Sequence, residues 1–171
     1  IERDRAAAYF ADESAGAQTL VCSEIGSEGR NFQFAHHLIL FDLPLNPDLL
    51  EQRIGRLDRI GQTEDVQIHV PFLAGGAQEV LLEWYDRGLN LFRESCSAGT
   101  MILERFQARL LPLLQDPDAT LEALIADTAA FTEKTRRELR EGRDRLLERN
   151  SCKADVAQQL IAESPATKRT T

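Results

Sequence analysis

The sequence predicts an α/β segment built on a parallel sheet, followed by an all-α extension. Short apolar runs that suit buried parallel strands alternate with helix-like segments up to residue 74. Gly75 and Gly76 then interrupt the pattern, and beyond them apolar residues recur at helical spacing without another strand-like run. We therefore expect the α/β part in residues 1–74, helices in residues 75–163 and a polar tail in residues 164–171.

The α/β part is expected to open on a helix near residues 2–10 and to continue with strands. Branched and apolar residues predict these strands in three runs, residues 19–22, 37–42 and 66–70. A loop of small residues, 23–31, follows the first run, at the strand end where open α/β sheets bind ligands. Gly26 and Gly29 would let a phosphate approach the backbone, although such a loop is equally typical of an ordinary strand-to-helix connection.

A second helix is expected to begin near Asp48 as its N-cap and to end at Gly61. Along it Gln52, Arg56 and Arg59 recur at i, i+4 and i+7, so that they would share one face. The opposite face is apolar at the same spacing, with Leu50, Ile54 and Leu57. Two cations and an amide suit a triphosphate whose charge shifts during transfer, whereas the simpler interpretation is the solvated face of a packed helix.

The all-α extension is predicted to contain three or four helices. Apolar side chains at helical spacing indicate helices over residues 77–95, around residues 102–113 and over residues 121–149. Pro112 and a turn at residues 116–118 are expected to separate the last two. The end of the last helix is dense in charges of both signs, which is typical of a solvated helix with i,i+4 pairs. A nucleic-acid contact is the alternative, and it would require basic charge on one side.

Composition and charge restrict the class of protein. The chain has 171 residues, of which 43% are hydrophobic, a normal share for a globular protein. Its formal net charge of −8 argues against a protein that coats nucleic acid, but it allows a local basic groove. No apolar run approaches the ~20 residues of a membrane span, so no membrane partner is expected. The chain opens on Ile1 inside an apparent helix, and we expect it to be part of a longer polypeptide.

The cysteines and histidines do not predict a metal site. Three cysteines lie far apart and lack the spacing of a zinc site: Cys22, Cys96 and Cys152. Reduced thiols are expected, with Cys22 in the core. His36 and His37 would point to opposite faces of a strand, and His69 lies in another strand-like run. A structural role is expected for each histidine.

Together, residues 23–31 and the octet at residues 52–59 resemble motifs V and VI of the superfamily-two helicases and translocases. The ending Arg-Ile-Gly-Gln at residues 59–62 is similar to that of the Swi/Snf-type branch. Two further stretches, residues 83–89 and 141–148, resemble the members of this branch that associate with bacterial RNA polymerase. The resemblance covers most of the chain and is most specific up to residue 72.

The resemblance implies that the α/β part is the end of the second RecA-like lobe, the helicase C-terminal lobe. Arg56 and Arg59 would be arginine fingers, and Gln52 would contact the phosphates or the attacking water. ATP with Mg²⁺ would be held mainly by a first lobe, because the sequence contains no G-x-x-x-x-G-K-[ST] loop and no acidic strand-end pair.

Motif V implies further contacts in the loop at residues 23–31. Nucleotide-binding roles fall on Glu28, Gly29 and Asn31. Nucleic-acid-binding roles fall on Ser23 and Gly26. Many relatives carry an acid where this chain has Asn31, so the resemblance does not extend to a direct ribose contact there.

The resemblance further implies an ATP hydrolase that moves along double-stranded DNA, with RNA as the alternative nucleic acid. Its implied partner is the core RNA polymerase, whose recycling it would promote in the bacterial cytoplasm, close to the nucleoid. The alternative function is a non-catalytic module that docks on the polymerase through the helical extension. The chain by itself is expected to be inactive, and half a parallel sheet exposes an apolar edge that favours a non-physiological dimer.

Overall fold

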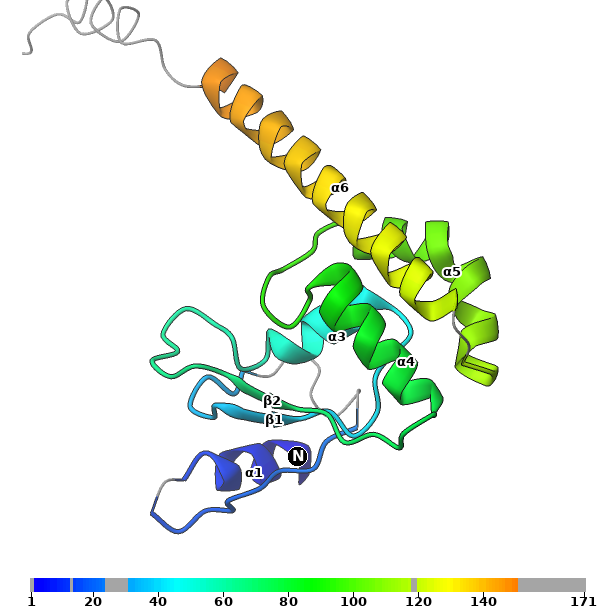
Figure 1. The fold of residues 1–171 in the computed structure, drawn as a ribbon. Helices are drawn as coiled ribbons and strands as arrows, with labels where there is room; N and C mark the ends of the chain where they lie inside the picture. The colour runs from blue at the N-terminus through cyan, green and yellow to red at the C-terminus, as the bar shows by residue number, and fades with distance from the viewer. Residues whose placement is uncertain (1, 13, 24–30, 118–119, 151–171) are drawn as a thin grey trace, which may run out of the picture. The chain divides into compact units, whose positions relative to one another are not determined.

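The computed structural model describes residues 2–12, 14–23, 31–117 and 120–150 (Figure 1). The chain divides into two compact units, Ile1–Glu133 and Lys134–Thr171. All the contacts described below between different elements lie in the first unit. Among the described residues, no helix combines the length and the apolar character that a membrane span requires.

The α/β part contains the predicted N-terminal helix and two of the predicted strands. Helix α1 covers Glu2–Phe10, and strands β1 (His37–Ile39) and β2 (Gln67–His69) pair in parallel. Leu38 of β1 lies opposite Ile68 of β2, and both side chains pack against the core. Because parallel neighbours need a crossover, the chain passes through helix α3 (Pro47–Ile54) between the two strands. The predicted order, a partial parallel sheet followed by helices, is confirmed.

The prediction of a strand at residues 19–22 is wrong. These residues have no regular secondary structure, the Val21 side chain is 93% exposed, and Cys22 is exposed instead of lying in the core. A branched apolar run becomes a strand only when a neighbouring strand accepts and donates its backbone hydrogen bonds. In the described part of the chain the sheet consists of β1 and β2, and neither pairs with this run.

Helix α3 is shorter than predicted at both ends. Its N-cap is Asn46 instead of Asp48: the Asn46 side chain accepts a hydrogen bond from the Asp48 backbone N–H at 2.9 Å, and Pro47 occupies the first turn. The helix ends at Ile54 because Gly55, a poor helix former, follows as the C-cap. Gly61, the predicted end, has a φ of 103° but lies in the turns beyond the helix.

The extension consists of helices in the described residues, as predicted. Helix α4 (Ala77–Glu83) continues directly into η1 (Trp84–Leu89), a π-helical turn, and Asn90 ends it with a left-handed φ of 54°. Helix α5 covers Gly99–Gln115, and helix α6 covers Thr120–Asn150 (Figure 1). The helix expected to reach residue 95 therefore ends earlier. Pro112 does not end α5 but lies in its last turns, and its carbonyl accepts a hydrogen bond from the Asp116 N–H.

One hydrophobic core connects the sheet, α3 and the extension. Leu40 and Leu50 from the α/β part belong to the same buried cluster as Trp84, Ile102 and Leu124 from the extension. Each such side chain contributes about 1.5–3 kcal/mol through its burial. The boundary at residue 74 stays a prediction, but this core extends across it.

The face of the sheet that points away from this core is open in the described residues. Ile39 is 64% exposed and Phe41, just after β1, is 83% exposed. Such apolar side chains are those that a further layer of a longer protein, or a second copy, would cover. The dimer expected from the sequence stays a prediction.

Candidate nucleotide and nucleic-acid site

Gln52, Arg56 and Arg59 do not share one helical face. Gln52 lies on α3 and is exposed, whereas Arg56 and Arg59 follow the helix in a series of turns. The chain tightens there because the Arg56 N–H bonds to the Arg53 carbonyl at 3.2 Å, an i to i−3 hydrogen bond. The prediction of a continuous helix over residues 52–59 is therefore wrong. The apolar side is confirmed, since Leu50 is fully buried and Leu57 is 4% exposed.

The two arginines differ in their surroundings. Arg56 is half-buried, while Arg59 is exposed. The Arg59 Nε donates a 2.7 Å hydrogen bond to the Gly55 carbonyl, four residues earlier. A guanidinium group has five N–H donors, so this contact orients the side chain while using one of them. An exposed, oriented guanidinium group is chemically suited to bind a phosphate.

The residues after the motif V loop are attached directly to the motif VI turns. The Phe32 N–H donates to the Arg56 carbonyl at 2.8 Å. The Gln62 side chain donates to the carbonyls of Ala35, at 2.9 Å, and Leu57, at 3.3 Å. The end of motif V and the arginine-bearing segment are thus held together through backbone carbonyls. Asn31 directly precedes Phe32, the residue whose N–H bonds to Arg56.

Asn31 itself is held in a local turn. Its side-chain oxygen accepts from the Gln33 N–H at 3.2 Å, and its amide nitrogen donates to the Gln33 side chain at 3.0 Å. The residue is exposed, as a nucleotide contact would require. Ser23 is also exposed but lies outside regular secondary structure. Three other predicted site residues lie outside the described residues: Gly26, Glu28 and Gly29.

Aromatic side chains pack α1 against this junction. The Phe10 ring lies 6.1 Å from the Phe32 ring and 5.3 Å from the Phe34 ring, measured between centroids. Aromatic pairs at these distances are attractive beyond their burial. The N-terminal helix therefore supports the irregular segment that contains Phe32, whose N–H bonds to the Arg56 carbonyl.

The histidines form a pair that sequence reasoning missed. His37 Nδ1 and His69 Nε2 lie 3.1 Å apart, because the parallel register places His37 opposite Gln67, two residues before His69. The His36 ring lies tilted against the His37 ring, with 4.5 Å between the ring centroids. The sequence did not predict the contact between His37 and His69, because the two residues are 32 positions apart in the chain. The described residues contain no group of three or more histidine, cysteine or carboxylate side chains able to hold a metal ion.

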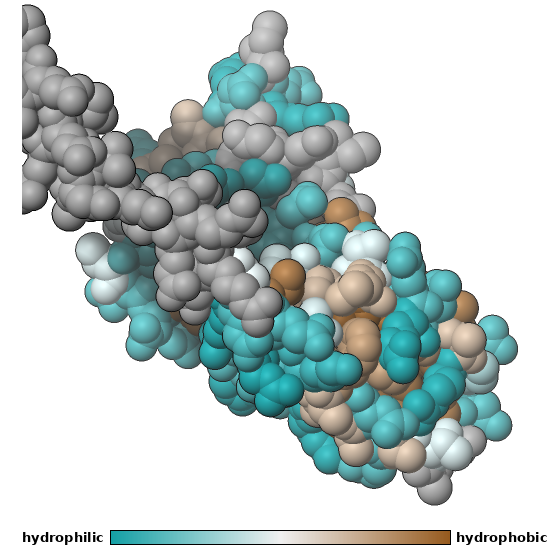
Figure 2. Space-filling model, turned by 90° about the horizontal axis from the view of Figure 1, so that it is seen from above, coloured by the Kyte–Doolittle hydropathy of each residue, from teal (hydrophilic) through white to brown (hydrophobic). Residues whose placement is uncertain are grey.

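The described surface carries both polar and apolar side chains (Figure 2). On the face drawn in Figure 2, hydrophilic residues cover most of the described surface and surround a smaller apolar area. In α6, Lys134 and Glu138 form an i,i+4 ion pair at 3.9 Å, the type of pair expected of a solvated helix.

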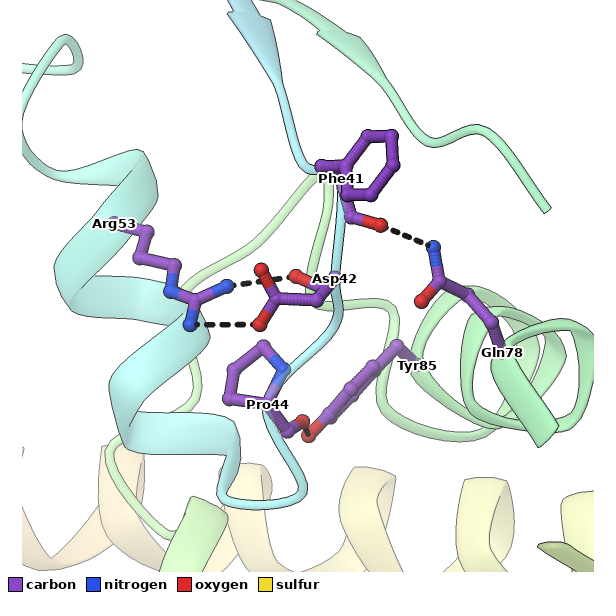
Figure 3. A network of polar contacts seen from close by, with 6 residues as sticks. All are labelled: Phe41, Asp42, Pro44, Arg53, Gln78 and Tyr85. Atoms are coloured by element: carbon purple, nitrogen blue, oxygen red, sulfur yellow. Dashed lines mark hydrogen bonds and ion pairs between the residues drawn. The ribbon is translucent and has the colours of Figure 1, made fainter. Parts of the chain in front are cut away.

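The loop that leads from β1 into α3 is bonded to residues that the sequence did not single out. Arg53 of α3 donates to the Asp42 carbonyl at 2.7 Å and to its carboxylate at 3.2 Å (Figure 3). Gln78 of α4 and Tyr85 of η1 contact the same loop. The only sequence signal for these contacts is the Trp-Tyr pair at residues 84–85, whose position in an apolar stripe indicates burial but not the partner.

A two-strand parallel sheet, a crossover helix and a turn that carries two arginines agree with the class that the comparison gives for the first part of the chain, a helicase C-terminal domain. Residues 1–61 match the family described as "Helicase conserved C-terminal domain". The particular family is given by the rest of the chain. Residues 65–170 match the family described as "RNA polymerase recycling family C-terminal", and the chain belongs to this family.

Curated relatives carry the same name in several bacteria. The chain is 57% identical over 164 residues to RNA polymerase-associated protein RapA of Pseudomonas putida GB-1, covering 95% of this chain. It is 61% identical over 162 residues to RapA of Stutzerimonas stutzeri A1501 and 52% identical over 168 residues to RapA of Vibrio parahaemolyticus. It spans 17% of the length of each of these relatives.

Proposed function

We propose that this chain acts as the end of the second motor lobe in a Swi/Snf-type ATPase that moves along double-stranded DNA and recycles RNA polymerase in the bacterial cytoplasm. The family membership supports the polymerase association. One structural observation supports the motor role above the others. The Phe32 N–H to Arg56 carbonyl bond ties the end of motif V to the motif VI arginines, as a shared nucleotide site requires.

In this proposal Arg56 and Arg59 stabilise the phosphate charge that develops when ATP is hydrolysed. The residues fit this substrate, because the Arg59 guanidinium is exposed and oriented by the Gly55 carbonyl. Gln52, exposed on α3, would orient the attacking water. Mg²⁺ would be held by the first lobe and would compensate phosphate charge there.

Nucleic acid would contact the neighbouring motif V loop. Ser23, the predicted nucleic-acid contact, is exposed at the start of this loop. Asn31, which is predicted to contact the nucleotide, is exposed at its end, next to Phe32 and its hydrogen bond to Arg56. Because the arginines act across a cleft between lobes, closure over ATP would move the two nucleic-acid contacts relative to each other. Repeated closure and opening is translocation.

The test is nucleic-acid-stimulated ATP hydrolysis by the full-length protein, meaning this segment together with the preceding lobe. Arg56→Ala and Arg59→Ala are compared with wild type. We expect turnover to fall by about 10³-fold or more, the range typical of arginine fingers. Arg109→Ala is the matched control, since Arg109 is an exposed arginine of α5 that pairs with Asp127 at 2.6 Å.

Turnover within about threefold of wild type in both variants would contradict the motor role of these arginines. If polymerase binding persisted in that case, the docking-module function would become the better explanation. Loss of turnover in the Arg109→Ala control would show that any loss of surface charge is harmful, and would also count against the proposal.

A further inference from the structure

The loop at residues 41–44 is held from three sides. Arg53 of α3 bonds to Asp42, while Gln78 of α4 donates to the Phe41 carbonyl at 3.0 Å (Figure 3). The same Gln78 amide nitrogen donates to the Pro71 carbonyl at 2.6 Å. This side chain therefore connects the segment that follows β1 with the segment that follows β2. Two of the three anchoring elements belong to the helical extension and not to the α/β part.

The third anchor is Tyr85. Its hydroxyl group donates to the Pro44 carbonyl at 2.6 Å, and its side chain is fully buried. Burial raises the pKa of the Tyr85 phenol, so the group stays protonated and remains a donor throughout the physiological range. A buried carbonyl that lost this donor would have little access to water, and its position would no longer be defined by a bond.

The extension also contacts the helix that this loop leads into. Thr100, at the start of α5, donates to the Asp48 carboxylate at 2.5 Å. The Cys96 N–H donates to the Glu51 carboxylate, one turn further along α3. Pro47 and Gly99 pack so closely that a Cβ at residue 99 would lie 2.8 Å from Pro47 Cβ. The first turns of α3 are therefore in direct contact with the extension.

We propose that Tyr85 and Gln78 are positioning residues that set the entry of α3, and with it the placement of Gln52 and the arginines that follow. This inference rests on the proposed function of Arg56 and Arg59. It adds that the RNA polymerase recycling segment is a structural part of the ATPase site. The route runs from the Tyr85 hydroxyl through the Pro44 carbonyl to the N-cap of α3 at Asn46, two residues away.

The experiment compares Tyr85→Phe with a control that removes an equivalent bond elsewhere in the extension. Thr128→Val is that control, because Thr128 Oγ1 accepts from the neighbouring Trp84 Nε1 at 3.0 Å and both side chains are fully buried. Each variant nearly keeps the shape of the side chain. Tyr85→Phe deprives the Pro44 carbonyl of its donor, and Thr128→Val deprives the Trp84 Nε1–H of its acceptor and also removes the 2.8 Å bond from the Thr128 hydroxyl to the Leu124 carbonyl. Turnover, the KM for ATP and thermal unfolding are measured on the full-length protein.

We expect both variants to lower the unfolding temperature, but Tyr85→Phe alone to lower kcat, by about three- to tenfold. The KM for ATP should stay within about twofold of wild type, because finger contacts are made mainly in the transition state. Gln78→Leu, at a half-buried residue outside the hydrophobic core, is expected to lower kcat in the same direction without disturbing the core. It keeps the test valid if Tyr85→Phe fails to fold.

Equal kcat values for Tyr85→Phe and Thr128→Val, together with wild-type kcat for Gln78→Leu, would overturn the inference. The proposed function fails separately, when Arg56→Ala and Arg59→Ala retain turnover. If those two variants lose turnover while Tyr85→Phe behaves like Thr128→Val and Gln78→Leu behaves like wild type, the arginine fingers stand and only the positioning role of Tyr85 and Gln78 is wrong.

Discussion

Replacing Gly99 with alanine tests how closely α5 and α3 are packed. A Cβ at this residue would lie 2.6 Å from Asp48 Oδ1 and 2.8 Å from Pro47 Cβ. Carbon atoms in contact normally stay about 3.5–4.0 Å apart, so the two helices would have to separate by roughly 1 Å. Overpacking of this kind costs about 1–3 kcal/mol. The higher helix propensity of alanine offsets at most about 1 kcal/mol of it.

We therefore expect Gly99→Ala to lower the free energy of unfolding by about 1–2 kcal/mol. For a chain of this size, that corresponds to a Tm lower by about 2–8 °C. Urea unfolding followed by circular dichroism gives the free energy, and a thermal scan gives the Tm. Part of the loss should appear as a weakened Thr100–Asp48 contact, because Asp48 is the group that must move.

Gly142→Ala is the matched control, since it makes the same substitution in an exposed part of α6 where a Cβ would meet nothing within 4 Å. It should be neutral or stabilising by up to about 1 kcal/mol. If Gly99→Ala were as stable as Gly142→Ala, the close approach of α5 to α3 would be refuted.

Two further predictions concern charge and activity. The pKa of Glu122 is lowered by its hydrogen bonds to Arg87, at 2.6 and 2.7 Å, so its stabilising contribution is present at neutral pH and is lost as the pH falls through that lowered pKa. Glu122→Gln should therefore have a lower free energy of unfolding than wild type at neutral pH, and this difference in stability should vanish in acid. Unfolding curves at both pH values measure it. A difference in stability that persists or grows in acid would contradict the prediction. The chain by itself should show no ATP hydrolysis in a phosphate-release assay, since it contains no phosphate-binding loop. Turnover above background that Arg56→Ala abolishes would show that reasoning to be wrong.

Local sequence patterns correctly predicted the elements that find their packing or pairing partners within the described residues. The runs around His37 and Gln67 became paired strands, and the apolar spacing of Leu50 and Leu57 identified the buried side of the motif VI segment. The run at residues 19–22 carried the same signal but has no paired strand in the described residues, and composition does not reveal whether a neighbour is present.

The roles of the site residues stay predictions, whereas their local geometry differs from the one that the spacing suggested. Spacing at i, i+4 and i+7 suggested one helical face, whereas Gly55 ends α3 and places Arg56 and Arg59 in turns. The contact of Tyr85 with Pro44 joins residues 41 positions apart. No periodicity encodes such a contact, because it depends on how the helices pack after they form.

The shared core has a consequence for how such proteins can recombine. The two family matches meet at residues 61–65, but Leu40 and Leu50 before that boundary belong to the same buried core as Trp84 and Ile102 after it. Recombination between two relatives at residues 61–65 would join two parts whose side chains had not been selected to fill the same core. Exchange of segments between relatives is therefore expected to lower stability when the junction lies between the two family matches, because both sides contribute to one core.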